Sequence, residues 1–278
     1  MNSKPPITRA RPGRGLRGIV RAFILGAVAA ALVGCVYFPR ATTQPIPTLA
    51  SRDARGGEGR AETLIVFLPG RGDRMEDFVQ KGLSAELSRA GVRADWISVD
   101  AHLGYYRARS VIERLKKDVI TPARQQGYRR IVVVGISLGG LGGLLYERDQ
   151  PGEIDALVLM APFLGGKDKV FAEITAAGGP EAWASARQNE SSEAKNSDLE
   201  RDLWSFLGKR HAQLPPTWLA FGEADRYADG HRLFAPLIPD KRVFRDSGGH
   251  DWKTWQVLWR EVCERSDVFA EEKKMRVR

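Results

Sequence analysis

Cysteine and histidine are scarce in this sequence, which contains only two and four of them among 278 residues. Two cysteines, Cys35 and Cys263, cannot form a disulfide framework, so the fold does not depend on disulfides. The sequence shows no cluster of cysteines and histidines at metal-ligand spacing, and its chemistry calls for no metal and no other cofactor. Cys263 stands alone in a helical pattern, and we expect it to be a small buried apolar residue.

The first 34 residues lack acidic side chains, and they also lack a hydrophobic run long enough to span a bilayer. The apolar run Ala22–Val33 has about 12 residues, whereas a spanning helix needs about 20. A basic region before a short apolar core is typical of an export signal, so we expect residues 1–34 to be a signal peptide. Its basic residues are Lys4, Arg9, Arg11, Arg14, Arg17 and Arg21.

The apolar run ends in Leu32-Val33-Gly34-Cys35, which resembles the lipobox of bacterial lipoproteins. This resemblance implies cleavage before Cys35, lipidation of its thiol and attachment to a membrane. Two alternatives stay open: an uncleaved anchor extended to Phe38, or an ordinary signal peptide with Cys35 incidental. All three put the protein in the cell envelope or outside it. Val36 replaces the aspartate that tends to retain such lipoproteins at the inner membrane, so by resemblance we expect the outer membrane, facing the periplasm.

The chain lacks a large excess of one charge once the signal is set aside. It has 43 Lys and Arg against 34 Asp and Glu, and six of the basic residues precede Cys35. The remainder carries a net charge of about +3, which gives no case for nucleic-acid binding. Residues 35–61 are rich in proline, threonine and glycine without periodicity, so we expect a lipidated cysteine and a flexible tether. Residues 62–278 are then one folded domain without internal repeats.

Six apolar stretches in that domain have the length and composition of buried strands, and helical patterns lie between them. One helix is predicted across Phe78, Val79, Leu83 and Leu87, ending at Gly91, and another across residues 111–120. Strands that alternate with helices indicate an α/β fold, a mostly parallel sheet with helices on both faces. The strands are expected at residues 63–68, 94–99, 130–134, 156–160, 217–221 and 242–244.

The third of these strands runs directly into Gly135-Ile136-Ser137-Leu138-Gly139, and a glycine-rich helix start follows. A serine at the tip of a sharp strand-to-helix turn has strained φ and ψ, and larger residues two positions away would collide. The same turn points the Leu138 N–H at the site, where it can stabilise an oxyanion. The alternative is a plain glycine-rich turn with a capping serine.

This turn resembles the nucleophile elbow of the α/β-hydrolase superfamily, which implies that an acid and then a histidine follow Ser137. Asp225 comes three residues after Gly222 at the end of the fifth strand, where that family keeps its acid; Glu223 and Asp229 are the alternatives. His250 lies in Gly248-Gly249-His250-Asp251-Trp252-x-x-Trp255, which resembles the signature of bacterial esterases related to esterase D and the ferric-siderophore esterases. The resemblance implies a Ser137, Asp225, His250 triad.

Further expectations come from the same resemblance. The loop after the first predicted strand implies a second oxyanion donor, for which Arg71 is the candidate; a plain Pro-Gly turn is the alternative. The family's first two antiparallel strands have no room before Thr63, so a trimmed fold is expected. The helical stretch at residues 165–214 is expected to form a small cap. His102 precedes Ser137, and this chain order favours a structural or pocket-lining role for it.

The resulting hypothesis is an exported, lipid-anchored serine hydrolase that cleaves small-molecule or lipid carboxylic esters through an acyl-enzyme. An acyltransferase or a peptidase could use the same triad, and a catalytically silent binding lipoprotein could keep the fold. Arg71 beside the oxyanion position would favour substrates with an anionic group. The Arg71-Gly72-Asp73 tripeptide also matches an adhesion motif, but three residues are too few to indicate that function.

Overall fold

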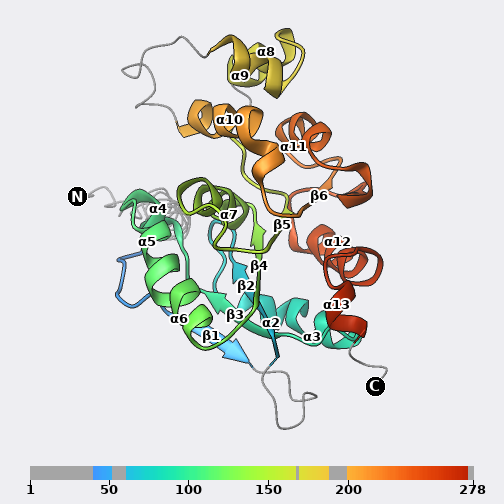
Figure 1. Cartoon of the computed structure of the whole chain (residues 1–278). Coiled ribbons are helices and arrows are strands. Elements are labelled where there is room, and N and C mark those ends of the chain that lie inside the picture. The colour runs from blue at the N-terminus through green and yellow to red at the C-terminus, as the bar shows by residue number, and fades with distance from the viewer. Residues whose placement is uncertain (1–39, 52–60, 167–168, 188–198, 275–278) are drawn as a thin grey trace, which may run out of the picture. The chain divides into compact units, whose positions relative to one another are not determined.

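The computed structural model describes residues 40–51, 61–166, 169–187 and 199–274, and within them it contains a seven-stranded sheet (Figure 1). The strand order is β1-β3-β2-β4-β5-β6-β7, in which β1 is antiparallel to β3 and all other neighbours are parallel. The predicted α/β fold is thereby confirmed. The strands are β1 Thr48–Ser51, β2 Thr63–Leu68, β3 Asp95–Val99, β4 Arg130–Ile136, β5 Ala156–Met160, β6 Thr217–Gly222 and β7 Val243–Asp246.

Helices cover both faces of this sheet, because the central strands bury side chains in both directions. Every residue of β2, β5 and β6 is buried. On β2, Leu64 and Val66 belong to the core that faces α4 to α7, whereas Ile65 and Phe67 belong to the core that faces α2, α3 and α12. These helices are α2 Asp77–Gln80, α3 Leu83–Arg89, α4 Leu103–Arg107, α5 Val111–Leu115, η1 Lys116–Ile120 (a π-helix), α6 Thr121–Gln125, α7 Leu138–Asp149, α11 Ala228–Phe234, α12 Trp252–Arg265 and α13 Ala270–Lys274.

The single helix predicted across residues 78–87 is wrong, since the structure has two short helices there. Gly82 adopts a φ of 81° between α2 and α3, a left-handed conformation that ends the first helix. The break turns Val79 outward, where 43% of its surface is exposed, while Phe78 remains buried. The predicted helix at 111–120 is present, but its second half is the π-helix η1.

The prediction that the family's first two antiparallel strands have no room before Thr63 is wrong for one of them. Thr48–Ser51 pairs with β3 as an edge strand, and Ile46 just before it is buried. Arg40 holds the same segment by two hydrogen bonds to the Asp100 carboxylate, of 2.7 and 3.0 Å. The proline-rich composition concealed a four-residue edge strand, a position that tolerates such flanks. The predicted signal peptide, Cys35 and residues 52–60 lie outside the described residues.

A helical insertion between β5 and β6 contains α8 Lys169–Ala176, α9 Pro180–Ala186, α10 Leu199–Arg210 and η3 His211–Gln213. It corresponds to the cap expected at residues 165–214, and α8 to α10 lie together beyond the end of β5 (Figure 1). Trp183, Trp204 and Leu207 form its buried core. Cys263 is fully buried in α12, as predicted. Across the described stretches, no helix combines the length and the apolar character that a membrane crossing requires.

Candidate active site

Ser137 occupies the turn between β4 and α7 with φ 50° and ψ −109°, a conformation that side-chain-bearing residues rarely adopt. Its main chain is held on both sides. The Ser137 N–H donates to the Met160 carbonyl at 2.9 Å, and the Ser137 carbonyl accepts the N–H groups of Phe163 at 2.9 Å and Leu141 at 3.1 Å. The strain is therefore maintained by the end of β5 and by the first turn of α7.

The glycines on either side of Ser137 are required by backbone packing. A Cβ on Gly135 would lie 2.3 Å from the Gly139 carbonyl oxygen, and a Cβ on Gly139 would lie 2.1 Å from the Leu68 carbonyl oxygen. Since both obstacles are main-chain atoms, neither position can accommodate a side chain without moving a strand or a helix. The steric reasoning from the Gly-x-Ser-x-Gly spacing agrees with these contacts.

His250 connects Ser137 with Asp225. Its Nε2 lies 2.9 Å from the Ser137 Oγ, and its Nδ1 lies 2.7 Å from the Asp225 Oδ2. The imidazole is fixed between two aromatic rings, Tyr227 at 5.0 Å and Trp255 at 5.1 Å between centroids, both edge-on. The three side chains come from the carboxyl ends of β4, β6 and β7, where parallel strands bring their loops together.

The Asp225 carboxylate is fully buried, with no exposed side-chain surface. Burial by itself would raise the pKa of Asp225, but hydrogen bonds from His250 and from the Tyr227 N–H at 2.8 Å outweigh it and lower the pKa. An ionised Asp225 accepts the Nδ1–H of His250, which leaves Nε2 as the acceptor for the Ser137 hydroxyl. This arrangement has the geometry of a nucleophile with its general base and an orienting acid.

The two alternative acids point elsewhere. Glu223 forms a bidentate hydrogen-bonded pair with Arg232, whose nitrogens lie 3.1 and 2.7 Å from one Glu223 oxygen. Asp229 accepts from the same Arg232 at 3.2 Å. Both carboxylates are exposed, so their charges are neutralised at the surface and neither contacts His250.

The two candidate oxyanion donors lie on adjacent segments. Leu138 is the first residue of α7, where an α-helix leaves the N–H without an intrahelical acceptor. Arg71 lies in the turn after β2, which a hydrogen bond from the Asp73 N–H to the Gly70 carbonyl closes at 3.2 Å. The end of β2 touches Gly139, so the Arg71 loop and the start of α7 are neighbours.

The remaining histidines have other environments. His102 caps α4, accepting the Gly104 N–H at its Nδ1 at 3.1 Å, which is a structural role. His211 is near the Glu181 carboxylate in the insertion, at 3.5 Å. His231 is fully buried, its Nε2 donates to the Pro162 carbonyl at 2.8 Å, and burial lowers its pKa to about 4. The sequence carried no signal for His231, since a lone histidine on a helix has no distinguishing pattern.

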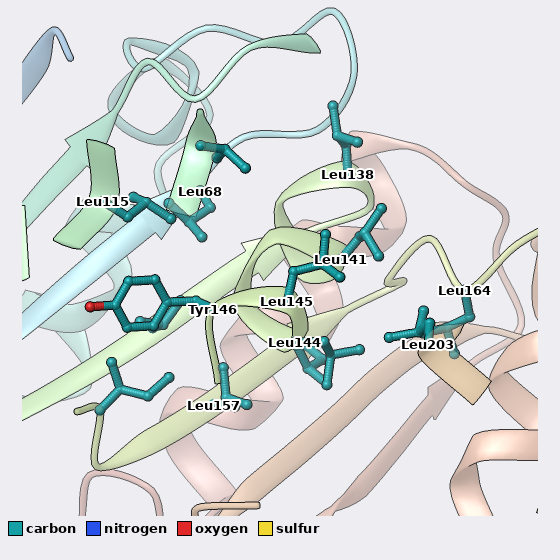
Figure 2. Packing of buried hydrophobic residues seen from close by; sticks show 14 of the residues in the cluster. Leu68, Leu115, Leu138, Leu141, Leu144, Leu145, Tyr146, Leu157, Leu164 and Leu203 are labelled. Atoms are coloured by element: carbon teal, nitrogen blue, oxygen red, sulfur yellow. The ribbon is translucent and has the colours of Figure 1, made fainter. Parts of the chain in front are cut away.

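A mostly apolar cavity of about 240 Å³ lies between α7 and the insertion, and it is lined by Leu141, one turn of α7 from Ser137. Two of its lining residues, Leu141 and Phe163, are those whose N–H groups bind the Ser137 carbonyl. Figure 2 shows Leu141 on α7 with Leu164 and Leu203 across from it. The cavity is lined by Leu141, Phe163, Leu164, Gly165, Leu199, Glu200 and Leu203. Sequence reasoning could not find it, because its walls come from three separate segments.

Comparisons with known proteins identify the fold and the family. The fold resembles Est1E from Butyrivibrio proteoclasticus, with a TM-score of 0.56, 14% identity and coverage of 84% of this chain and 98% of that one. It also resembles a monoacylglycerol lipase from Paleococcus ferrophilus, with a TM-score of 0.52, 18% identity and coverage of 80% of this chain and 99% of that one. No curated protein matches the sequence. The sequence pattern of the Alpha/beta hydrolase family matches residues 65–275. The chain belongs to the alpha/beta hydrolase family.

Proposed function

We propose that the protein is a serine hydrolase that cleaves carboxylic esters through an acyl-enzyme intermediate. The proposal rests on two hydrogen bonds that join a strained Ser137 through His250 to a buried Asp225. They measure 2.9 Å from the Ser137 Oγ to the His250 Nε2 and 2.7 Å from the His250 Nδ1 to the Asp225 Oδ2. A capping serine would need neither the histidine nor the strain. Membership of a hydrolase family supports the same reaction class.

The residues have separate roles in this reaction. Ser137 Oγ attacks the acyl carbon and passes its proton to His250 Nε2, while Asp225 stabilises the imidazolium that forms. The Leu138 and Arg71 N–H groups stabilise the tetrahedral oxyanion. His250 then donates the proton to the leaving alkoxide, which departs as an alcohol. A water molecule attacks the acyl-enzyme with His250 again as the base, releasing the acid and regenerating Ser137.

The cavity between α7 and the insertion supports an apolar acyl group as one half of the substrate. Most of its lining residues are leucine or phenylalanine, and Leu141 lies one turn of α7 from Ser137. We therefore expect an acyl chain to bind between Leu141 and Leu203. Arg71, an exposed residue in the turn after β2, would favour an anionic substituent on the substrate.

The test is labelling of the full-length protein, purified in detergent, with a fluorophosphonate probe. We expect the parent to be labelled and to hydrolyse p-nitrophenyl esters from acetate to octanoate, and Ser137→Ala and His250→Ala to do neither. Circular dichroism controls for folding of both variants. A folded parent that is neither labelled nor active contradicts the proposal. Adding excess alcohol to the assay measures transfer, since a new ester at the expense of free acid identifies an acyltransferase.

We also propose that the chain is exported and anchored to the outer membrane by lipid on Cys35. The support is the sequence alone: the basic region, the short apolar run and the cysteine that ends it. Metabolic labelling of cells with palmitate, followed by fractionation of the membranes, tests this. We expect label on the parent and none on Cys35→Ser, and an unlabelled parent contradicts the proposal without affecting the hydrolase assignment.

A further inference from the structure

The Arg71-Gly72-Asp73 stretch contains a carboxylate that the proposed reaction leaves unused. Asp73 Oδ1 accepts the Trp252 indole N–H at 3.0 Å, from a residue 179 positions later in the chain. Its carboxyl also takes a hydrogen bond from the Gly70 backbone. The contact is close, because a Cβ on Gly70 would lie 2.5 Å from Asp73 Oδ2. The side chain thus folds back over the loop that carries the Arg71 N–H.

Trp252 belongs to the other catalytic loop. It is the first residue of α12, two positions after His250, and its ring contacts Trp255 edge-on at 5.3 Å. Trp255 in turn contacts the His250 ring. On its other side Trp252 packs edge-on against Phe78 of α2, at 6.0 Å. The indole is therefore fixed in orientation by both segments, and its N–H can reach Asp73 only while they keep their present spacing.

We propose that Asp73 is a positioning residue that couples the oxyanion loop to the histidine loop through Trp252. The inference rests on the proposed function, since it assigns the Arg71 loop to the oxyanion. A donor must lie at 2.7–3.1 Å from the oxyanion to be effective, so the spacing between the Arg71 turn and the histidine loop matters. The hydrogen bond between Asp73 and Trp252 joins these two segments.

Burial raises the pKa of Asp73, and the nearby Asp77 carboxylate raises it as well, while hydrogen bonds from Trp252 and the Gly70 backbone and the charge of His250 lower it. The Trp252 hydrogen bond therefore also favours the ionised carboxylate, which is the stronger acceptor.

Two substitutions test the link between Asp73 and Trp252. Trp252→Phe removes the indole N–H and keeps the charge of Asp73. Asp73→Asn keeps the size of the side chain but has one acceptor oxygen in place of two, so it breaks one hydrogen bond and also removes the charge. Asp77→Asn is the matched control, because its carboxylate accepts the Arg74 N–H at 2.7 Å and does not contact Trp252.

The experiment measures kcat and KM for hydrolysis of p-nitrophenyl butyrate by the four full-length proteins and by the double variant. We expect about a tenfold lower kcat at nearly unchanged KM for Trp252→Phe and Asp73→Asn, from misplacement of the donor. The double variant should lose no more than Asp73→Asn does, because both changes break one link.

The outcomes distinguish the inference from the function on which it rests. If the parent neither hydrolyses esters nor reacts with the fluorophosphonate, both are overturned. If the parent is active and both variants, folded by their thermal unfolding curves, keep a kcat within twofold of that of Asp77→Asn, only the role of Asp73 is overturned. Should Trp252→Phe fail to fold, the kcat of Asp73→Asn decides alone.

Discussion

The carboxyl end of the sheet and the helical insertion beside it are built by different means. At the sheet end, main-chain atoms leave no room for a Cβ at Gly135, Gly139 or Gly222, with obstacles at 2.3, 2.1 and 2.1 Å. The insertion has such a contact at Gly208, where a Cβ would lie 2.3 Å from the Pro180 carbonyl oxygen. Other contacts within it are made by side chains: Trp204 and Leu207 are buried, and Arg201 donates two hydrogen bonds of 2.7 Å to Glu173. Main-chain contacts thus fix the sheet end, whereas side-chain contacts make up more of the insertion.

The difference indicates a division of labour. The reaction needs atoms held within a few tenths of an ångström, which backbone packing provides. Substrate choice needs a wall that can change by substitution without disturbing the nucleophile, which α10 provides with Leu199 and Leu203. Substitutions at the sheet end should therefore abolish activity or folding, and substitutions in the insertion should alter selectivity.

The largest expected effect on the sheet-end side of the comparison is that of Asp225→Asn. An amide would present the wrong hydrogen-bonding group to His250 Nδ1 and disfavour the required tautomer, so we expect kcat to fall about 10⁴-fold. Asp229→Asn is the matched control, since its carboxylate pairs with the exposed Arg232, and it should keep activity within about twofold. Steady-state ester hydrolysis measures both, and equal losses would remove Asp225 from the triad.

The next effect is on folding. Gly139→Ala brings a Cβ to 2.1 Å from the Leu68 carbonyl oxygen, and we expect the free energy of unfolding to fall by more than about 3 kcal/mol. Gly143→Ala, one turn later in α7, would meet side chains and no main-chain atom among its nearest neighbours, the closest being Leu157 at 3.1 Å. Gained helix propensity offsets that contact, so its change should stay within about 1 kcal/mol. Urea unfolding compares the two, and similar stabilities would show that the elbow adjusts more freely than its contacts indicate.

His231 lies where the two regions meet, because α11 packs against both β6 of the sheet and α8 of the insertion. The His231 side chain binds the Pro162 carbonyl, and neighbouring Gly230 lies against Phe171 of α8. Its pKa is about 4 in the folded protein and about 6.5 when unfolded, so the unfolded state binds the extra proton between these values. Stability should therefore decrease as the pH falls from 6.5 toward 4, by at most about 3 kcal/mol.

The substitution His231→Gln keeps a donor for the Pro162 carbonyl and removes the titration. We expect its unfolding free energy to depend less on pH across this window than that of the parent. His102, whose pKa burial also lowers, leaves a residual slope of the same sign. Urea unfolding at pH 7.5, 6 and 5 provides the measurement, and parallel curves for parent and variant would assign the slope to other groups.

The same contrast explains what could be predicted from the sequence. Buried parallel strands and the Gly-x-Ser-x-Gly turn follow from short-range rules, so the positions of β2 and β4 and the need for Gly135 and Gly139 were predictable. The edge strand β1 was not, because its four residues bury little and its flanks look like a linker. The Asp73 to Trp252 hydrogen bond and the cavity join residues that are distant in the chain, and single-sequence patterns do not contain such pairings.

The smallest expected effect is on the insertion side, at Leu203. This residue is 1% exposed on α10 and faces Leu141 across the cavity (Figure 2). Leu203→Phe fills part of the 240 Å³, and Leu203→Val enlarges it by about one methylene. Because a methylene in an apolar pocket is worth about 1 kcal/mol, we expect the ratio of kcat/KM for octanoate over acetate esters to fall several-fold in Leu203→Phe and to rise modestly in Leu203→Val.

The variants Leu203→Phe and Leu203→Val serve as controls for each other, because they change the size of the same side chain in opposite directions. A general loss of packing would lower kcat/KM for all esters in both variants, whereas an acyl pocket changes the ratio in opposite directions. Equal ratios in parent and both variants would mean that the acyl group binds elsewhere. In that case the insertion would not select the acyl group, and its side-chain contacts would serve another role, such as access to the site rather than recognition within it.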